Sequence, residues 1–134
     1  MGVEAASDEH KQLILQTMVA IAGADGRLVE SETATICRLY QRLTGDEIAP
    51  LDVAQALETR AASSLHLADL LKSRRDGLDM RARESLLRAA YLVLMSDKRV
   101  AARERKKLHD YAKALEIPDI HLTAILEDLS SLSD

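Results

Sequence analysis

The sequence predicts an all-α protein, a compact bundle of about seven helices, and three observations lead to that prediction. Apolar residues make up 47% of the 134 residues, yet Phe and Trp are absent, so Leu, Ile, Val, Ala and Met must fill the core. Only five Gly and two Pro are available for tight turns, and no segment alternates apolar and polar residues over the length of a strand. Several long segments instead repeat apolar residues at helical spacing. We therefore expect packed helices and no sheet.

The first two helices are expected over about 8–24 and 30–44. Ser7 suits an N-cap, and two acids follow it in what would be the first helical turn. Apolar side chains cover most of the first helix, which predicts that it is central, whereas the second helix carries them on one side only. Gly45 is the expected stop of the second helix.

The rest of the chain is expected to form five further helices. Asp79 suits an N-cap for a long apolar helix, and each of the two prolines in the chain suits the start of a helix. The expected helices are two short ones within 46–79, one of them beginning near Pro50, and others over about 80–95, about 102–115 and from Pro118 onward.

An internal repeat relates the two halves of the chain. A shift of 72 residues places Asp25 on Asp97 and Glu32 on Glu104, and it also superposes the apolar positions of the helices that follow. The two copies cover about 10–45 and 82–117. The repeat predicts a single domain, residues 1–134, built from two helix-turn-helix halves that pack about a pseudo-twofold axis.

The acidic charge of the chain belongs to its first part. The net charge is −4, with eight acids and four bases in residues 1–50 and fourteen of each in residues 51–134. The six bases within 98–107 are interspersed with acids or flanked by them, which is typical of a solvated helix face. No basic footprint of a nucleic-acid-binding protein is present, so we expect no nucleic-acid partner.

Location follows from three further features. The longest apolar stretch, 13–24, is interrupted by polar residues and is shorter than the roughly 20 residues that a membrane span requires. Cys37 is the one cysteine and cannot form an intramolecular disulfide, and the polar, acidic N-terminal segment does not resemble a signal peptide. We expect a cytoplasmic protein with no membrane span.

Two stretches of the chain resemble one family. MVAIAGADGRLVESE, and its second copy LVLMSDKRVAARE, resemble the tellurite-resistance TerB family, whose signature is an apolar helix ending in Ala-Asp-Gly with a Glu seven residues after the Asp. The resemblance covers about 13–129, and the duplicated context strengthens a short motif. It implies a helical bundle in a bacterial cytoplasm, associated with resistance to tellurite and other stresses. Related domains attached to membrane-anchored J-domain co-chaperones look like protein-interaction modules.

The resemblance also implies a candidate metal site at each corner, where a divalent cation would bind acidic residues. Carried over to this chain, the ligands are Asp25 and Glu32 in the first copy and Asp97 and Glu104 in the second. The chain departs from the family pattern at three positions. Lys98 stands where the second copy would have Gly, and Val29 and Ala101 stand where a capping Ser, Thr or Asp would precede the helix.

The first corner also has an interpretation that needs no ligand. Four amide groups at the start of a helix lack partners inside it, and Val29 has no side chain to cap them. The carboxylates of Asp25 and Glu32 could accept their hydrogen bonds and lock the corner. Oxygen ligands are few for a self-sufficient calcium or magnesium site, and Arg27 and Val29 occupy ligand positions of an EF-hand loop. We therefore predict that these acids cap the helix, with metal binding as the alternative.

No catalytic constellation is recognisable, and we expect no enzyme. His10, His66, His109 and His121 have no metal-ligand spacing, and Cys37 is expected to be a part-buried, inert thiol. Three functional classes remain: a scaffold that binds protein partners through an acidic face, a metal-responsive module and, less favoured, an enzyme. The acidic face would form if two pairs of acids share one end of the molecule, namely Glu30 with Glu32 and Asp46 with Glu47.

Overall fold

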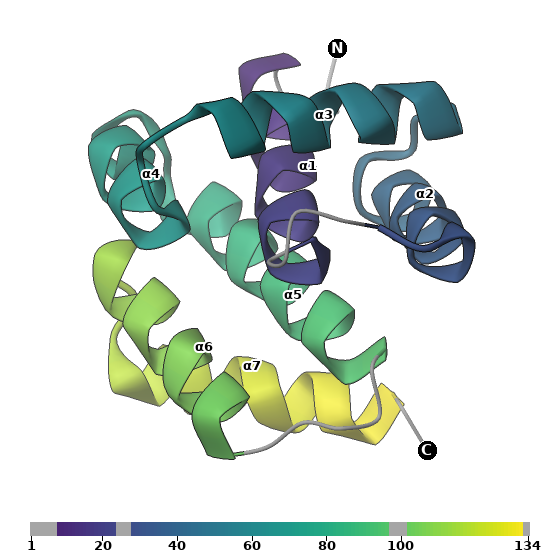
Figure 1. Ribbon diagram of the computed structural model, residues 1–134. Helices are drawn as coiled ribbons and strands as arrows, with labels where there is room; N and C mark the ends of the chain where they lie inside the picture. Colours follow the sequence, from purple (N-terminus) through teal and green to yellow (C-terminus); the bar gives the residue numbers. More distant parts are fainter. Residues whose placement is uncertain (1–7, 24–27, 97–101, 133–134) are drawn as a thin grey trace, which may run out of the picture. The chain divides into compact units, whose positions relative to one another are not determined.

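The computed structural model describes residues 8–23, 28–96 and 102–132, and within these ranges the chain forms seven α-helices, one short 3₁₀-helix and no strand (Figure 1). The all-α prediction is confirmed. By its internal contacts the chain divides into two compact units, which we call unit 1 (Met1–Ser64) and unit 2 (Leu65–Asp134). In the described ranges no helix has both the length and the apolar character of a membrane span.

Unit 1 is a triangle of three helices in which each helix contacts the other two. The helices are α1 (Asp8–Ala22), α2 (Glu30–Thr44) and α3 (Pro50–Ala62). As expected, α1 has the most buried residues of the three, on several sides of the helix, whereas α2 buries mainly one face. The fully buried side chains of α1 are Ile14, Thr17, Met18 and Val19.

The ends of these helices follow the local sequence. Gly45 ends α2 in the left-handed region, with φ of 82°, and its amide donates to the carbonyl oxygen of Gln41 at 2.8 Å. Pro50 begins α3 at a position where its missing N–H is not needed. At the end of α1, a Cβ atom on Gly23 would lie 2.7 Å from Cδ1 of Leu57 in α3. A larger residue at this position would require the tip of the Leu57 side chain to move.

Unit 2 contains the remaining helices. They are α4 (Leu67–Arg74), η1 (Arg75–Gly77), α5 (Met80–Ser96), α6 (Ala102–Ala114) and α7 (Asp119–Leu132). Helix α5 contacts α6 and α7, these two contact each other, and α4 packs against α6. The carboxylate of Asp79 accepts a hydrogen bond from the amide of Ala82 at 2.8 Å, which confirms the N-cap predicted for α5.

The predicted repeat pairs α1 and α2 with α5 and α6, which follow each other in the same order in the two units. The first described residues of α1 and α6 border residues outside the described ranges, so the repeat itself stays a prediction. The triangle of α1, α2 and α3 is matched by the triangle of α5, α6 and α7, so each copy includes a third helix that the sequence analysis left outside the repeat. The twofold relation between the copies concerns the placement of the two units and stays a prediction.

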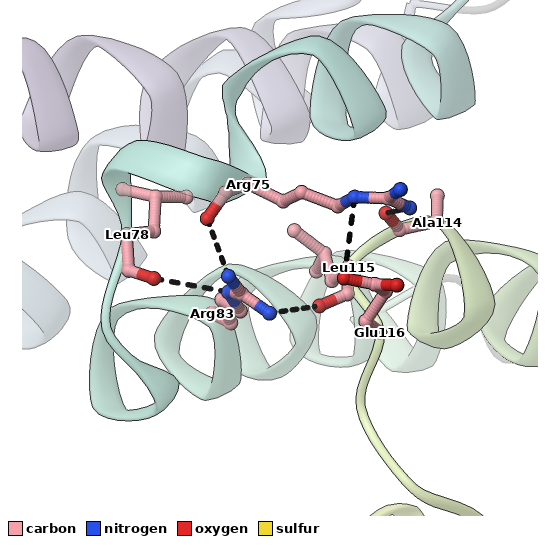
Figure 2. A network of polar contacts seen from close by, with 6 residues as sticks. All are labelled: Arg75, Leu78, Arg83, Ala114, Leu115 and Glu116. Carbon is pink, nitrogen blue, oxygen red and sulfur yellow. Dashed lines mark hydrogen bonds and ion pairs between the residues drawn. The ribbon is translucent and has the colours of Figure 1, made fainter.

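In unit 2, the guanidinium group of Arg83 ties three segments together (Figure 2). Its three nitrogens donate to the carbonyl oxygens of Leu78 at 3.0 Å, Leu115 at 3.1 Å and Arg75 at 2.7 Å. One side chain on α5 thus satisfies carbonyl groups in η1, in the following turn and at the end of α6.

Arg75 supports the same helix end. It donates to the carbonyl oxygen of Ala114 at 3.1 Å, and its Nε atom lies 3.4 Å from a carboxylate oxygen of Glu116 (Figure 2). Glu116 has a φ of 56°, so α6 ends with a left-handed residue that is not glycine. The amide of Ile117 donates to the carbonyl oxygen of Ala112 at 2.8 Å, which closes the turn.

Candidate functional site

The first corner holds the capping interaction that was predicted for Glu32. The carboxylate Oε1 of Glu32, in the first turn of α2, accepts a hydrogen bond from the amide of Val29 at 3.0 Å. Val29 has extended backbone geometry just before the helix and offers no side-chain cap, so the glutamate takes that role. Its negative charge also lies where the helix dipole favours it. The prediction for Glu32 is confirmed, whereas Asp25 lies outside the described residues.

The second corner leaves its prediction open. Asp97 lies outside the described residues, and Glu104 belongs to α6 but its side chain is outside them too. Among the described residues, no three His, Cys, Asp or Glu side chains gather closely enough to hold a metal ion. The metal-site prediction for Asp25, Glu32, Asp97 and Glu104 therefore stays a prediction.

Helix α3 uses the same capping device as α2, and the sequence analysis missed it. The carboxylate of Asp52 accepts a hydrogen bond from the amide of Ala49 at 2.9 Å. Ala49, like Val29, precedes the helix and has no capping side chain. The signal was present in the sequence. In both cases an acid stands three residues after the residue that precedes the helix, Glu32 after Val29 and Asp52 after Ala49.

The two pairs of acids that could form the acidic face lie at opposite ends of α2. Glu30 and Glu32 lie in the first turn of α2, whereas Asp46 and Glu47 follow its last residue. The 15 residues of α2 separate the two pairs by about 22 Å along the helix axis, since an α-helix rises about 1.5 Å per residue. These four acids therefore do not meet at one helix end, and a face shared by them stays a prediction.

A different set of four acids lies at helix termini of unit 1 and in the loop after α2. We call Asp8, Asp46, Glu47 and Asp52, which are all exposed, the acidic end of unit 1. They lie at the start of α1, in the loop after α2 and in the first turn of α3. Asp46 forms an ion pair with Lys11 of α1, and both Asp46 and Asp8 lie near enough to influence the pKa of Tyr40.

The charge balance at this end is negative. Arg42, in the last turn of α2, and Lys11 are the bases nearby, against four acids. The hydrogen bond to Asp46 raises the pKa of Lys11, so this amine stays charged and neutralises one of the four carboxylates. Leu51 lies between Pro50 and Asp52 in the sequence and is 66% exposed. The acidic end therefore includes one large apolar side chain that the fold of unit 1 leaves uncovered.

Cys37 and the four histidines fall at separate places. Cys37 is partly buried on α2, and burial raises the pKa of its thiol, which disfavours the reactive thiolate, in accord with the inert thiol that was predicted. His10 lies on α1, His66 directly precedes α4, His109 lies on α6 and His121 on α7.

Comparisons with known proteins give no relative. No protein-family model, curated protein or solved structure matches the chain. The proposal for its function therefore depends on the geometry above and on the motif resemblance.

Proposed function

We propose that the chain is a non-enzymatic interaction module, TerB-like and associated with tellurite resistance and stress response, that binds a basic segment of a cytoplasmic partner protein through the acidic end of unit 1. The observation that carries the proposal is that four exposed carboxylates lie at three helix termini of unit 1, with the exposed Leu51 next to one of them in the sequence. Capping of α3 requires only one of these carboxylates, that of Asp52.

Electrostatics and apolar contact would have separate roles in this binding. Carboxylates at the rim of an interface steer a basic partner and raise the association rate, but they add little affinity after desolvation. A large apolar side chain that is buried at the centre contributes more affinity. Leu51, 66% exposed beside Asp52, is the residue in this position. We expect Leu51→Ala to increase the dissociation rate, and loss of the acids to decrease the association rate.

An affinity-capture experiment tests the proposal. The wild-type chain and the Glu47→Lys variant serve as baits, and Glu30→Lys, which makes the same charge change at the other end of α2, is the matched control. Supporting partners are retained by the wild type and by Glu30→Lys, are lost with Glu47→Lys, and elute as salt rises past about 0.15 M, where the screening length is about 8 Å. Partners retained equally by all three baits at every salt concentration contradict the proposal.

Metal binding at the corners is the second candidate function. Only Oε1 of Glu32 accepts a hydrogen bond among the described contacts, so its other oxygen could serve a divalent cation together with Asp25. Calorimetric titration with calcium, magnesium, manganese and zinc tests this candidate. A micromolar affinity that Asp25→Asn abolishes without a change in the melting temperature would favour it over the capping interpretation.

A further inference from the structure

A groove of about 340 Å³ lies between α5 and α7 in unit 2, away from every residue discussed above as a functional candidate except His121. Its size is at the lower end of the range of about 300–1,000 Å³ that small-ligand pockets span, so it suits one long side chain rather than a cofactor. Its lining residues are Glu84, Arg88, His121, Ala124, Ile125 and Asp128.

The charges in the groove leave one carboxylate uncompensated. Arg88 forms an ion pair with Asp128, with 3.2 Å between Nη1 and Oδ2, so each of these side chains has a partner of opposite charge. Glu84 stands one helical turn before Arg88 on α5 and is only partly exposed. Within the described part of the chain, no ion pair or side-chain hydrogen bond of its carboxylate is seen, so Glu84 presents a negative charge to the groove.

The groove also offers apolar contact from the exposed Ala124 of α7, beside Ile125, which is only 3% exposed. A ligand that matches both features has an apolar stem and a positively charged end. Long basic side chains have this form, since lysine and arginine place their methylene groups on apolar surface while the charged head reaches a polar group. A metal ion matches less well, because the acidic and histidine side chains here do not form a group that could coordinate one among the described residues.

We propose that this groove binds one lysine or arginine side chain of a partner protein, with the methylene stem on Ala124 and the cationic head on Glu84. A carboxylate pairs with a guanidinium or ammonium group through charge-assisted hydrogen bonds, which are stronger than neutral ones. This site lies in unit 2 and does not depend on the acidic end of unit 1, so an experiment can contradict either proposal without contradicting the other.

The test is an NMR titration of the full ¹⁵N-labelled chain with short blocked peptides at low salt. The probes are acetyl-Ala-Lys-Ala-amide, its arginine counterpart and its norleucine counterpart, which keeps the stem and lacks the charge. We expect the two basic peptides to bind in the millimolar range, as a single side chain allows. The amide signals of Arg88, Ala124 and Ile125 should move most, and the norleucine peptide should bind at least about fivefold more weakly. Equal binding of the norleucine peptide overturns the proposal.

Two variants and one control localise the binding. Glu84→Gln should weaken the binding of the lysine peptide about fivefold or more. Glu127→Gln removes the same charge from an exposed position of α7 outside the groove, and it should leave the binding unchanged. Ala124→Gln lengthens an exposed side chain on the groove wall and should block the stem. An equal loss in Glu84→Gln and Glu127→Gln, or shifts spread over the surface acids, contradicts the proposal.

Discussion

Units 1 and 2 share a triangle of three helices but end the second helix of that triangle in different ways. In unit 1, α2 stops at Gly45, which adopts the left-handed conformation without a Cβ to strain it. In unit 2, α6 stops at Glu116, which adopts the same conformation at a cost of about 1 kcal/mol. Arg75 and Arg83 hold this second end by binding the carbonyl groups of Ala114 and Leu115. One architecture is thus stabilised locally in one copy and by distant side chains in the other.

The two units also differ in charge and in packing. Unit 1 contains ten acids and five bases, a net charge of −5, whereas unit 2 contains twelve acids and thirteen bases, a net charge of +1. Gly23 at the end of α1 is buried against α3, whereas Met95, 72 residues later, is 39% exposed. The two units thus share the contacts among three helices and differ at the helix ends and on the surface.

The largest expected effect is that of Arg83→Ala. The change leaves three part-buried carbonyl groups without their charged donor, and the free energy of unfolding should fall by about 3 kcal/mol. Urea denaturation measures the loss, and hydrogen exchange should locate it in α6 and in the turn after η1. Arg81→Ala, an exposed arginine on the same helix, is the control and should change stability by less than about 0.5 kcal/mol. Equal effects of the two variants would mean that the arginine network does not hold α6.

Gly23→Ala tests the close approach that is specific to unit 1. Its new Cβ would lie 2.7 Å from Cδ1 of Leu57 and 3.0 Å from the carbonyl oxygen of Val19, so the Leu57 side chain must turn away and the end of α1 must adjust. We expect a loss of about 1–2 kcal/mol in thermal or urea unfolding. At the equivalent position of unit 2, Met95→Ala should cost about 0.5 kcal/mol or less. If Gly23→Ala leaves the stability unchanged, the close contact at Gly23 does not distinguish unit 1 from unit 2.

The two left-handed residues should respond with opposite signs. Gly45→Ala introduces a Cβ at φ of 82° and should lower stability by about 1 kcal/mol. Glu116→Gly relieves the corresponding strain but removes the ion pair with Arg75, which is worth up to about 1 kcal/mol because Glu116 is 56% exposed. We expect no loss or a small gain for Glu116→Gly. Gly77→Ala, at an open position without a positive φ, is the neutral control.

Alkaline pH should destabilise unit 1 more than unit 2. The hydrogen bond to Asp46 raises the pKa of Lys11, and burial raises the pKa of Tyr40, Cys37 and Tyr111. A raised pKa means that the folded state holds its proton more tightly, so stability is present at neutral pH and is lost as the pH rises through the folded pKa. The ordinary values of these groups are 9.0 to 10.5, and the melting temperature should therefore fall from about pH 9 upward. Tyr40→Phe should reduce this fall, as should Tyr111→Phe in unit 2, and a fall unchanged by Tyr40→Phe contradicts the contribution of unit 1.

Local signals predicted most of the fold. Apolar spacing placed all seven helices, and Asp79, Pro50 and Gly45 marked helix ends that the structure confirms. Glu32 was predicted as a cap because an acid at this position reaches the amide before the helix. These features depend on residues within one helical turn of each other, which is why a sequence reveals them.

Features that depend on distant residues were missed. The sequence analysis missed the third helix of the repeat because its register differs between the two halves. A shift of 72 places Pro50, the first residue of α3, on position 122. Helix α7 begins three residues earlier, at 119, after a shorter loop. The contacts of Arg83 with Leu115 and of Arg75 with Ala114 join residues 32 and 39 positions apart and leave no periodic pattern. The length predicted for α2 already separated Glu30 and Glu32 from Asp46 and Glu47.

The most direct test of the proposed function is the association rate of a captured partner with two charge-reversal variants. Glu30 and Glu47 lie at opposite ends of α2, and replacing either one by lysine changes the net charge equally. If the acidic end of unit 1 is the docking surface, Glu47→Lys lowers the association rate and its salt dependence, whereas Glu30→Lys leaves both close to the wild-type values. Equal slowing by both variants would show that only the overall charge matters, and slowing by Glu30→Lys alone would place the docking surface at the first corner. Either of these results contradicts the proposal.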